Sequence, residues 1–519
     1  MASGINDLEQ CQPQRCETDV IIVGAGPTGL CCALLARQLG LTVKIFERRP
    51  GPLEAGRADA LNARTQQVLE IVGVLGDLRP KGLLCNTSSV FKDGEFQSRN
   101  NRWWTSIADS AYKEFLMIGQ ADVERALVKH LDIDVLYETE VSKVSESDRE
   151  VKVTVGGETM YSKYLIAADG GQSQIRKQLG IEFRGDMPNM RWAVLDTFIK
   201  TDFPVCNEII SFEHNGQSRV SWIPRERGMA RFYILLEGEV TQEKSEKSIR
   251  KHMAPFNVEF SKTEWFSTYD VQERVAASFT SPLSKIILAG DASHIHAVNG
   301  GQGLNTGVAD AFGLVWRLAL AIRCTSYAEA LGQKLLCSYD IERRKAAETV
   351  VEVAGKLVRS TLRTAQEYVT IVEQKAANIT GMGVKYAPNV LSTMESCAGS
   401  FQAGSRFPDI SFLKSNVVLL RLYEIARYGR FLIFNSGKMR ISVPSWLEDR
   451  IDIWTVTRDG EKWNVTTSTP ATLTTEHPFP EDAVVIMRPD FYIGYAGHDA
   501  TSYFNRFSND PTINAGTSN

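Results

Sequence analysis

The segment GDASHIHAVNGGQGLNTGVADA, residues 290–311, holds side chains and backbone that could do two kinds of chemistry. Asp291, His294 and His296 provide a carboxylate and two imidazoles, which are ligands for a transition metal. The glycines that follow favour another use, because glycine lets backbone approach a ligand closely. A metal site would also need further ligands and hydrogen-bonded support, and the chain has only 7 histidines. We therefore predict a ligand-binding loop and no metal.

A second glycine-rich segment lies near the N-terminus. Residues 19–47 start with the apolar run VIIV, break at Gly24, Gly26 and Gly29, and end in TVKIFE. In a dinucleotide-binding strand–helix–strand unit, the first glycine makes the turn, the second admits the pyrophosphate, and the third lets helix approach strand. Glu47 stands where an acid accepts from ribose hydroxyls. The alternative is a chance glycine turn in an ordinary α/β domain, which explains the strand, helix and acid less well.

Two later segments have the same strand signal. YLIAADGGQSQIRKQLGI (164–181) and IILAGDASH (286–294) each join an apolar run to Gly and Asp. The carboxyl ends of such strands border one crevice in an open parallel sheet. An aspartate there is well placed to bind the ribityl or ribose hydroxyls of a long dinucleotide, and Asp291 would then need no metal. The helix expected after the glycines offers free N–H groups and a positive dipole end to an electron-rich ring edge.

Length, charge and cysteine usage narrow the class of protein. A chain of 519 residues predicts two or three domains. Lys+Arg 58 against Asp+Glu 62, without a basic block, argues against nucleic-acid binding. The 9 cysteines are scattered and form no CxxC, so neither a zinc site nor a disulfide framework is expected. The N-terminus lacks an apolar signal core, and the apolar stretches carry charges. We expect a cytoplasmic protein that does not span a membrane.

Together, GAGPTG, AADGGQSQIRKQLG and GDASH…GGQGLNTGVADAFGLVWRLA resemble three motifs of the class A FAD-dependent aromatic monooxygenases. The likeness is strongest to the phenol hydroxylase-like branch, which has the para-hydroxybenzoate hydroxylase fold. It implies an α/β fold: a Rossmann-type FAD-binding domain, an inserted antiparallel-sheet substrate domain and a C-terminal thioredoxin-like domain. The implied bounds are 18–190 and 275–380 for the first, 191–274 with parts of 85–118 for the second, and 400–510 for the third.

The resemblance also implies the cofactors. FAD would bind non-covalently, and NADPH or NADH would act as a transient reductant without a Rossmann domain of its own. Glu47 would bind the adenosine ribose and Gln120 the ribityl chain or pyrophosphate. Asp169 and Gly170 would border the pyrophosphate, and Asp291 would bind a ribityl hydroxyl. Arg57 would contact the pyrophosphate or the nicotinamide cofactor. The full predicted set, which adds the glycine loops and the backbone at the pyrimidine edge of the flavin, is Gly24, Gly26, Pro27, Thr28, Gly29, Glu47, Arg48, Arg57, Gln120, Asp169, Gly170, Asp291, Gly301, Gly303, Leu304 and Asn305.

The same likeness places a substrate site around Asp59, in GRADALNART. The segment SWIPRERGMARFYILLE (221–237) is similar to the strand pair that faces substrate in that branch. The plainer interpretation pairs Asp59 with Arg57 or Arg64, pairs Arg225 with Glu226 or another acid, and gives the tyrosines ordinary packing roles. The predicted catalytic set is Asp59, Arg225, Arg231, Tyr233 and Tyr269.

Phenol chemistry explains why such residues would be needed. In the family, reduced flavin and O2 give a flavin C4a-hydroperoxide, which attacks a ring carbon beside a phenolate. A phenol has a pKa near 10 and a free aspartate about 3.9, so proton transfer is opposed by about 8 kcal/mol. Asp59 alone cannot supply this. A buried arginine could stabilise the phenolate, and Tyr233 or Tyr269 could orient the ring or relay the proton. Water must be excluded.

One departure keeps other functions open. Val298 stands where the family usually has proline, which puts pocket shape in doubt. A flavin epoxidase, or another monooxygenase acting on a non-phenolic substrate, is the first alternative. A non-catalytic FAD-binding protein is the second, although Asp59 with Arg231 and Tyr233 argues against it. The expected partners are a small aromatic substrate, O2 and a second copy of the chain in a homodimer.

Overall fold

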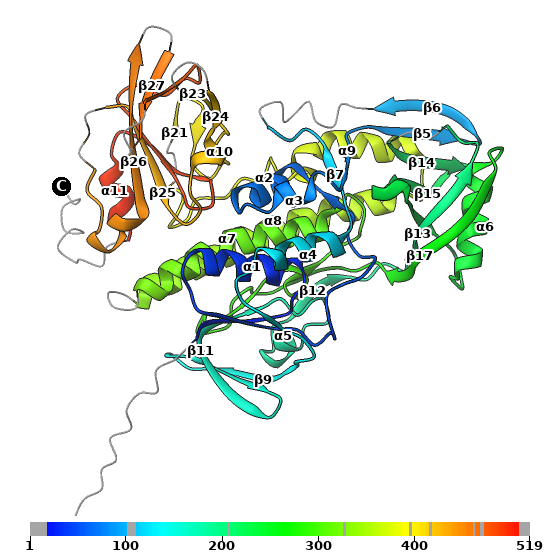
Figure 1. Ribbon diagram of the computed structural model, residues 1–519, viewed down its shortest axis with the longest axis horizontal. Helices are drawn as coiled ribbons and strands as arrows, with labels where there is room; N and C mark the ends of the chain where they lie inside the picture. The colour runs from blue at the N-terminus through cyan, green and yellow to red at the C-terminus, as the bar shows by residue number, and fades with distance from the viewer. Residues whose placement is uncertain are drawn as a thin grey trace, which may run out of the picture.

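The computed structural model describes residues 18–507, except 101–109, 205–206, 325–328, 394–396, 415–417, 438, 440, 460–461 and 468–471. Figure 1 shows two long helices, α7 and α8, in the middle of the molecule, with one sheet beneath them and further sheets at the two sides. The part of the predicted substrate segment at 101–109 lies outside the described residues.

The sheet beneath the helices carries all three glycine-rich segments. Its strand order is β8-β2-β1-β11-β10-β9, with β19 paired to β11. β1, β2, β11 and β19 run parallel, so the strand ends that precede the three motifs lie side by side, as predicted. The strands are β1 (Thr18–Val23), β2 (Val43–Phe46), β8 (Val135–Leu136), β9 (Val141–Glu146), β10 (Val151–Val155), β11 (Glu158–Ala167) and β19 (Ile286–Leu288).

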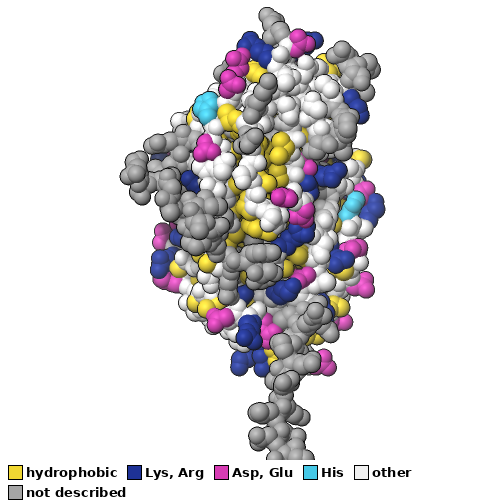
Figure 2. Space-filling model, turned by 90° about the vertical axis from the view of Figure 1, so that its left-hand side faces the viewer, with side chains coloured by type: hydrophobic (Ala, Val, Ile, Leu, Met, Phe, Trp, Pro, Cys, Tyr) yellow, Lys and Arg dark blue, Asp and Glu magenta, His cyan; other side chains and the backbone are white. Residues whose placement is uncertain are grey.

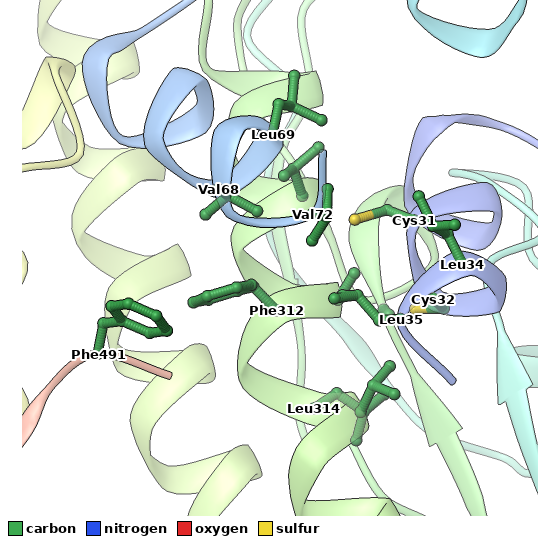
Figure 3. Close-up of a cluster of buried hydrophobic side chains, with 14 of the residues drawn as sticks. Cys31, Cys32, Leu34, Leu35, Val68, Leu69, Val72, Phe312, Leu314 and Phe491 are labelled. Carbon is green, nitrogen blue, oxygen red and sulfur yellow. The ribbon is translucent and has the colours of Figure 1, made fainter. Parts of the chain in front are cut away.

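Helices bury the apolar face of this sheet. Figure 3 shows Cys31 and Leu35 of α1 close to Phe312 of α7, with Val68 of α2 and Val72, which directly follows α2, above them. All five side chains belong to one buried cluster. None of the described helices is long and apolar enough to cross a bilayer. The helices are α1 (Pro27–Gln38), α2 (Ala63–Ile71), α3 (Leu75–Leu78), α4 (Gln120–Lys129), α5 (Gln174–Gln178), α7 (Gln302–Cys324), α8 (Glu329–Ser360) and α9 (Ala365–Ile379).

Two small sheets connect this unit to its neighbours. One places β7 (Phe115–Met117) between β3 (Ala60–Leu61) and β4 (Leu83–Cys85), next to Asp59. The other places β18 (Glu273–Ala276) between β12 (Phe183–Asp186) and β20 (His294–Ile295).

The substrate-domain sheet, at the right of Figure 1, has two unlike faces. Its order is β17-β13-β16-β15-β14-β5-β6. Because side chains alternate along a strand, Ala193 and Leu195 turn to one face, while Trp192 and Asp196 turn to the other. The first face is apolar and packs on α6. The elements are β5 (Ser88–Lys92), β6 (Glu95–Asn100), β13 (Arg191–Thr201), β14 (Ile209–His214), β15 (Gln217–Pro224), β16 (Ala230–Leu235), α6 (Gln242–Met253) and β17 (Val258–Asp270).

The C-terminal sheet has the order β24-β23-β28-β27-β26-β25-β29-β30. Its strands β29 and β30 form an antiparallel pair within residues 483–497. Only short helices accompany this sheet among the described residues, so the thioredoxin-like fold of this domain stays a prediction. The exact domain bounds also stay predictions. The elements are β21 (Cys397–Ala398), β22 (Phe401–Gln402), β23 (Ser411–Lys414), β24 (Val418–Arg421), α10 (Leu422–Ile425), β25 (Phe431–Asn435), β26 (Ile451–Asp459), β27 (Lys462–Thr466), β28 (Thr472–Thr475), β29 (Val484–Met487), β30 (Ile493–Gly497) and α11 (Ala500–Asn505).

Hydrophobic side chains gather in the middle of the face shown in Figure 2, the side on which the C-terminal sheet lies. Two exposed apolar residues of that sheet are Leu419 and Ile453, with 64% and 41% of their surface exposed. Such a surface is compatible with the predicted homodimer, which stays a prediction.

Four buried charges join the C-terminal sheet to the central helices. Arg488 contacts Glu342 of α8 at 2.7 Å and Asp490 at 2.7 Å. Arg317 of α7 contacts the same two carboxylates, Asp490 at 3.3 Å and Glu342 more closely. All four side chains are at most 1% exposed. Removing one cation would therefore leave buried carboxylates without their partner, which costs far more than the pair contributes.

The Arg488→Met variant tests this interface. We expect it to lower the free energy of unfolding by about 3 to 5 kcal/mol, because Glu342 and Asp490 would stay buried without that cation. The matched control is Arg323→Met, which breaks the exposed pair with Asp449 between α7 and the C-terminal sheet. That change should cost less than about 1 kcal/mol. Urea unfolding of both variants measures the difference, and equal losses would contradict the assignment.

Candidate active site

The glycines of the first loop differ in the space around them. Gly24 has φ +102°, and a Cβ there would lie 2.2 Å from the carbonyl oxygen of Ala168. A Cβ on Gly29 would lie 1.8 Å from the carbonyl oxygen of Gly24. Gly26 has no atom within 4 Å of such a Cβ. The geometry thus agrees with the predicted division, in which Gly24 and Gly29 shape the turn and Gly26 leaves room for a ligand.

Pro27 and Thr28 form the first turn of α1 and contact protein. Pro27 is buried at the start of the helix, where its missing N–H costs nothing. The Thr28 hydroxyl oxygen lies 2.5 Å from a Cβ built on Gly290 and 2.2 Å from one built on Gly307. Only glycine at these two positions lets α1, α7 and the 290 loop pack together. Gly290 was expected at the end of a strand, whereas the packing role of Gly307 was not predicted from the sequence.

Glu47 is held as an ionised acceptor at the end of β2. Its carboxylate accepts from the backbone N–H of Ala25 at 2.8 Å and of Arg49 at 2.9 Å. Burial alone would raise the pKa of Glu47, but these N–H groups and the charge of Arg49 hold it below the ordinary value. Arg48 is exposed, whereas Arg49 also approaches Glu124 at 3.5 Å. Arg49 thus supports the Glu47 carboxylate, and the role of Arg48 toward the cofactor stays a prediction.

Gln120 belongs to the same network. Its amide nitrogen donates to Glu124 at 2.9 Å, and its amide oxygen accepts from the N–H of Ala58 at 3.2 Å. Gln120 thus ties α4 to the segment that carries Asp59. Arg57, in that segment, has φ +66° and an exposed side chain. Burial raises the pKa of Asp291 and the charge of Arg57 partly opposes this rise, so Arg57 lies near Asp291; its role toward the cofactor stays a prediction.

Two carboxylates at the strand ends have free acceptor capacity. Asp169 accepts from the N–H of Gln174 at 2.8 Å through one oxygen, while its other oxygen is buried with no partner among the described residues. Gly170 beside it has open space at its Cα. Asp291 is exposed, although the surrounding protein raises its pKa by desolvation. Both positions fit the hydroxyl groups of an FAD molecule.

Asp310 of α7 holds the 290 loop from below. Its carboxylate accepts from the N–H of Gly290 at 3.0 Å, contacts Nε2 of His294 at 2.7 Å and contacts Nε of Arg343 at 2.7 Å. His294 is therefore engaged in a buried ion network. Burial lowers the pKa of His296 to about 4, and its Nδ1 bonds the carbonyl of Ala297 at 2.8 Å. No cluster in the described part of the chain has the make-up of a metal site.

The first turn of α7 connects the cofactor loop to the substrate segment. Asn305 accepts from the N–H of Asn62 at 2.9 Å and donates to the carbonyl of Ala60 at 2.9 Å. Gly301 has φ +63°, Gly303 has open space at its Cα, and Leu304 is buried. The Asn305 side chain thus fixes the strand after Asp59, which leaves the predicted role near the flavin to backbone.

Arg176 joins two of the predicted cofactor loops. Its guanidinium donates to the carbonyls of Ala292 at 2.7 Å and Gly171 at 3.0 Å. The residue stands in the quoted motif SQIRKQ, but sequence spacing could not show which backbone it reaches. Sequence reasoning therefore missed it.

Arg231 is the centre of the predicted substrate site. Its guanidinium binds both oxygens of Asp196 at 2.6 Å and approaches Asp59 at 3.3 Å. The hydroxyl of Tyr233 donates to Asp59 at 3.3 Å. Asp59 therefore pairs with neither Arg57 nor Arg64 in the structure. Asp196, which the sequence analysis missed, is the residue that orients Arg231.

Arg225 is paired with a protein carboxylate, whereas the hydroxyl of Tyr269 is not hydrogen-bonded among the described residues. Arg225 binds Glu226 through two nitrogens at 2.9 and 2.7 Å, the alternative pairing considered from the sequence. It is buried and approaches Asp196 at 3.5 Å, so its charge helps to hold the carboxylate that orients Arg231. Tyr269 has a buried hydroxyl with no partner among the described residues. Desolvation raises the pKa of Tyr269 and of Tyr233, so both stay protonated at neutral pH.

Comparison with known proteins places this arrangement in a family. Residues 17–354 match the FAD-binding domain family. The chain belongs to this family. It is 29% identical over 465 residues to a protein of Aspergillus fumigatus named phenol 2-monooxygenase fsqG, covering 82% of this chain and 75% of that one. A rifampicin monooxygenase of Streptomyces venezuelae is 27% identical over 511 residues, covering 94% and 97%.

Solved structures show the same fold. A ternary complex of aklavinone-11 hydroxylase with FAD and aklavinone superposes with a TM-score of 0.76 at 19% identity, covering 95% of this chain and 99% of that chain. Family membership and fold agree with the glycine loops described above. The chain is a flavoprotein monooxygenase whose cofactor is FAD.

The open glycine gives a test of the cofactor loop. Gly26→Ala should fold normally, because φ is −75° and a Cβ meets nothing, but should weaken FAD binding about tenfold or more by crowding the ligand. Gly76→Ala, in α3, also meets nothing and is the matched control. FAD titration by fluorescence quenching measures both, and unchanged affinity in Gly26→Ala would refute this role.

His296 gives a test of pH dependence. Its pKa is about 4 in the folded protein against 6.5 unfolded, so between these values the unfolded chain binds more protons and stability falls on acidification. The share lost between pH 7 and 5 is up to about 2 kcal/mol. His296→Asn should therefore show a flatter pH dependence of the unfolding midpoint at saturating FAD. Parallel curves for wild type and variant would rule this out.

Proposed function

We propose that the protein hydroxylates a phenolic or other aromatic small molecule, with O2 as oxidant and NADPH or NADH as transient reductant. The observation that carries this proposal is the carboxylate of Asp59, which lies between the guanidinium of Arg231 and the hydroxyl of Tyr233. This group is adjacent in sequence to the strand that Asn305 fixes beside the cofactor loop. The names of two relatives, phenol 2-monooxygenase and 3-hydroxybenzoate 4-monooxygenase, support a phenolic substrate.

FAD fits the residues that surround the three strand ends. Gly26, Gly170 and Gly303 leave open space next to backbone, and Asp169 presents a buried oxygen without a partner. We propose that these residues, with Glu47 and Asp291, hold the cofactor. When bound and reduced, FAD supplies the activation of O2 for transfer of one oxygen atom to the ring.

The protein's own part of the reaction is to move and hold a proton. Asp59 can accept the proton of a substrate phenol, directly or through the hydroxyl of Tyr233, which stays protonated because burial raises its pKa. Arg231 already neutralises one of the two carboxylates beside it, Asp196 and Asp59. When the proton moves to Asp59, the negative charge moves to the substrate oxygen and the net charge of the site is unchanged. Arg231 then stabilises the phenolate in place of Asp59.

The apolar surroundings of the tyrosines would exclude water. Trp192, Leu235, Ala297 and Val358 are buried in one cluster, with Tyr233 and Tyr269 packed against it. A dry site strengthens the attraction between Arg231 and a phenolate, because the local dielectric is low. It also limits the loss of activated oxygen to water.

We also propose that the protein forms a homodimer and is located in the cytoplasm. The exposed Leu419 and Ile453 support a homodimer through the C-terminal sheet. The free thiols of Cys31 and Cys32, adjacent and buried, support a reducing, cytoplasmic setting.

The Asp59→Asn variant tests the proposal. It should keep FAD bound and keep the fold, because Arg231 retains both bonds to Asp196, but lose hydroxylation by about 100-fold or more, since an amide accepts no proton. The measurement is product formed per NADPH oxidised across a panel of phenols. Asp122→Asn, at a surface pair with Arg125, is the control. Normal hydroxylation by Asp59→Asn would exclude Asp59 as the base, and equal use of non-phenolic alkenes would favour an epoxidase.

A further inference from the structure

Two buried hydrogen-bond donors on neighbouring strands, β13 and β17, have no partner among the described residues. The indole N–H of Trp192 and the hydroxyl of Tyr269 are both buried, and neither finds an acceptor among the described residues. Trp192 is 1% exposed. Buried polar groups in native proteins are nearly always hydrogen-bonded, so a pair of unmet donors in one place calls for an explanation.

The sheet register brings these two donors together. Trp192 of β13 lies opposite Tyr269 of β17 on one side and opposite Leu235 of β16 on the other. Directly opposed residues point to the same face of a sheet, and the alternation along β16 places Tyr233 on that face too. Trp192 and Tyr269 therefore lie on the face that carries Asp59's partners, beyond Tyr233 along the strands.

The positive charge of Arg231 is already paired with carboxylates of the protein. Arg231 gives its donors to Asp196, Asp59 and the carbonyl of Arg57. The residues packed around Trp192 are apolar, among them Val271 and Ala354. A carboxylate placed here would be buried without a cation, which is strongly unfavourable. A neutral oxygen would meet the donors without this penalty.

We propose that the substrate is a phenol with a second, uncharged oxygen substituent, such as a ketone, which accepts hydrogen bonds from Trp192 and Tyr269 while the phenol faces Asp59. This inference rests on the proposed function. The indole N–H can only donate, so it requires an acceptor on the substrate. Trp192 thereby determines specificity: a substrate without the acceptor leaves the N–H unpaired in the bound state.

The test compares size-matched phenols with the purified holoenzyme. Hydroxyacetophenones, ethylphenols and hydroxybenzoates, each as meta and para isomers, are assayed for coupled hydroxylation. We expect kcat/KM for the best ketone to exceed that of the matching ethylphenol and carboxylate by about 10- to 100-fold. Trp192→Phe should lower the ketone to the level of the ethylphenol and leave the ethylphenol within about twofold.

Trp222→Phe is the control, because Trp222 lies on the opposite face of the same sheet, toward α6. It should leave the ketone preference intact, whatever its effect on stability. Turnover of phenols without a ketone preference would overturn this inference and leave the proposed function standing. An equal loss for all substrates in Trp192→Phe would also overturn it, since that result marks a packing role. No turnover of any phenol would overturn both.

Discussion

The geometry of the site depends on one buried carboxylate, that of Asp310. It takes hydrogen bonds from a loop, a short strand and a long helix: the N–H of Gly290, the ring of His294 and the guanidinium of Arg343. Burial of a carboxylate is costly unless it is paired and hydrogen-bonded, so the three segments can pack only in the arrangement that supplies all these donors. The 290 loop, with Asp291 at its exposed end, is thereby fixed relative to α7. The cofactor position follows from this arrangement.

The substrate domain is fixed to the cofactor domain by the same kind of constraint. Arg231 lies on the sheet, whereas Asp59 and the carbonyl of Arg57 belong to the segment before β3. Asp196 fills the other two nitrogens of the guanidinium, so Arg231 has a single usable orientation. Asn305 then holds the strand after Asp59 against the first turn of α7. Polar contacts thus hold the segment around Asp59 on both sides, to Arg231 of the substrate-domain sheet and to Asn305 of α7.

The sequence predicted local patterns well and long-range partners poorly. The strand–helix–strand unit and the three adjacent strand ends follow from apolar runs and glycine spacing, and the structure contains them. Resemblance brought Asp59, Arg231 and Tyr233 into one set, and the structure places them together. Asp196 and Arg176 were missed because their partners lie 35 and 116 residues away. Arg48 and Arg49 are adjacent, and the apolar run before them does not specify which side chain turns toward Glu47 and Glu124.

Buried ion networks explain why three sheets of different origin form one site. A buried ion pair contributes little net stability compared with apolar residues of the same size, but breaking one is costly. Apolar packing alone would tolerate small shifts between the sheets, because dispersion contacts are not directional. Arg231 with Asp59, Asp310 with Arg343, and Arg488 with Glu342 each require defined angles and distances. Each network lies at a junction of elements distant in sequence, so their geometric demand sets the register of the junctions. The proposed proton acceptor and the flavin must be positioned accurately relative to each other, and these junctions set that relative position.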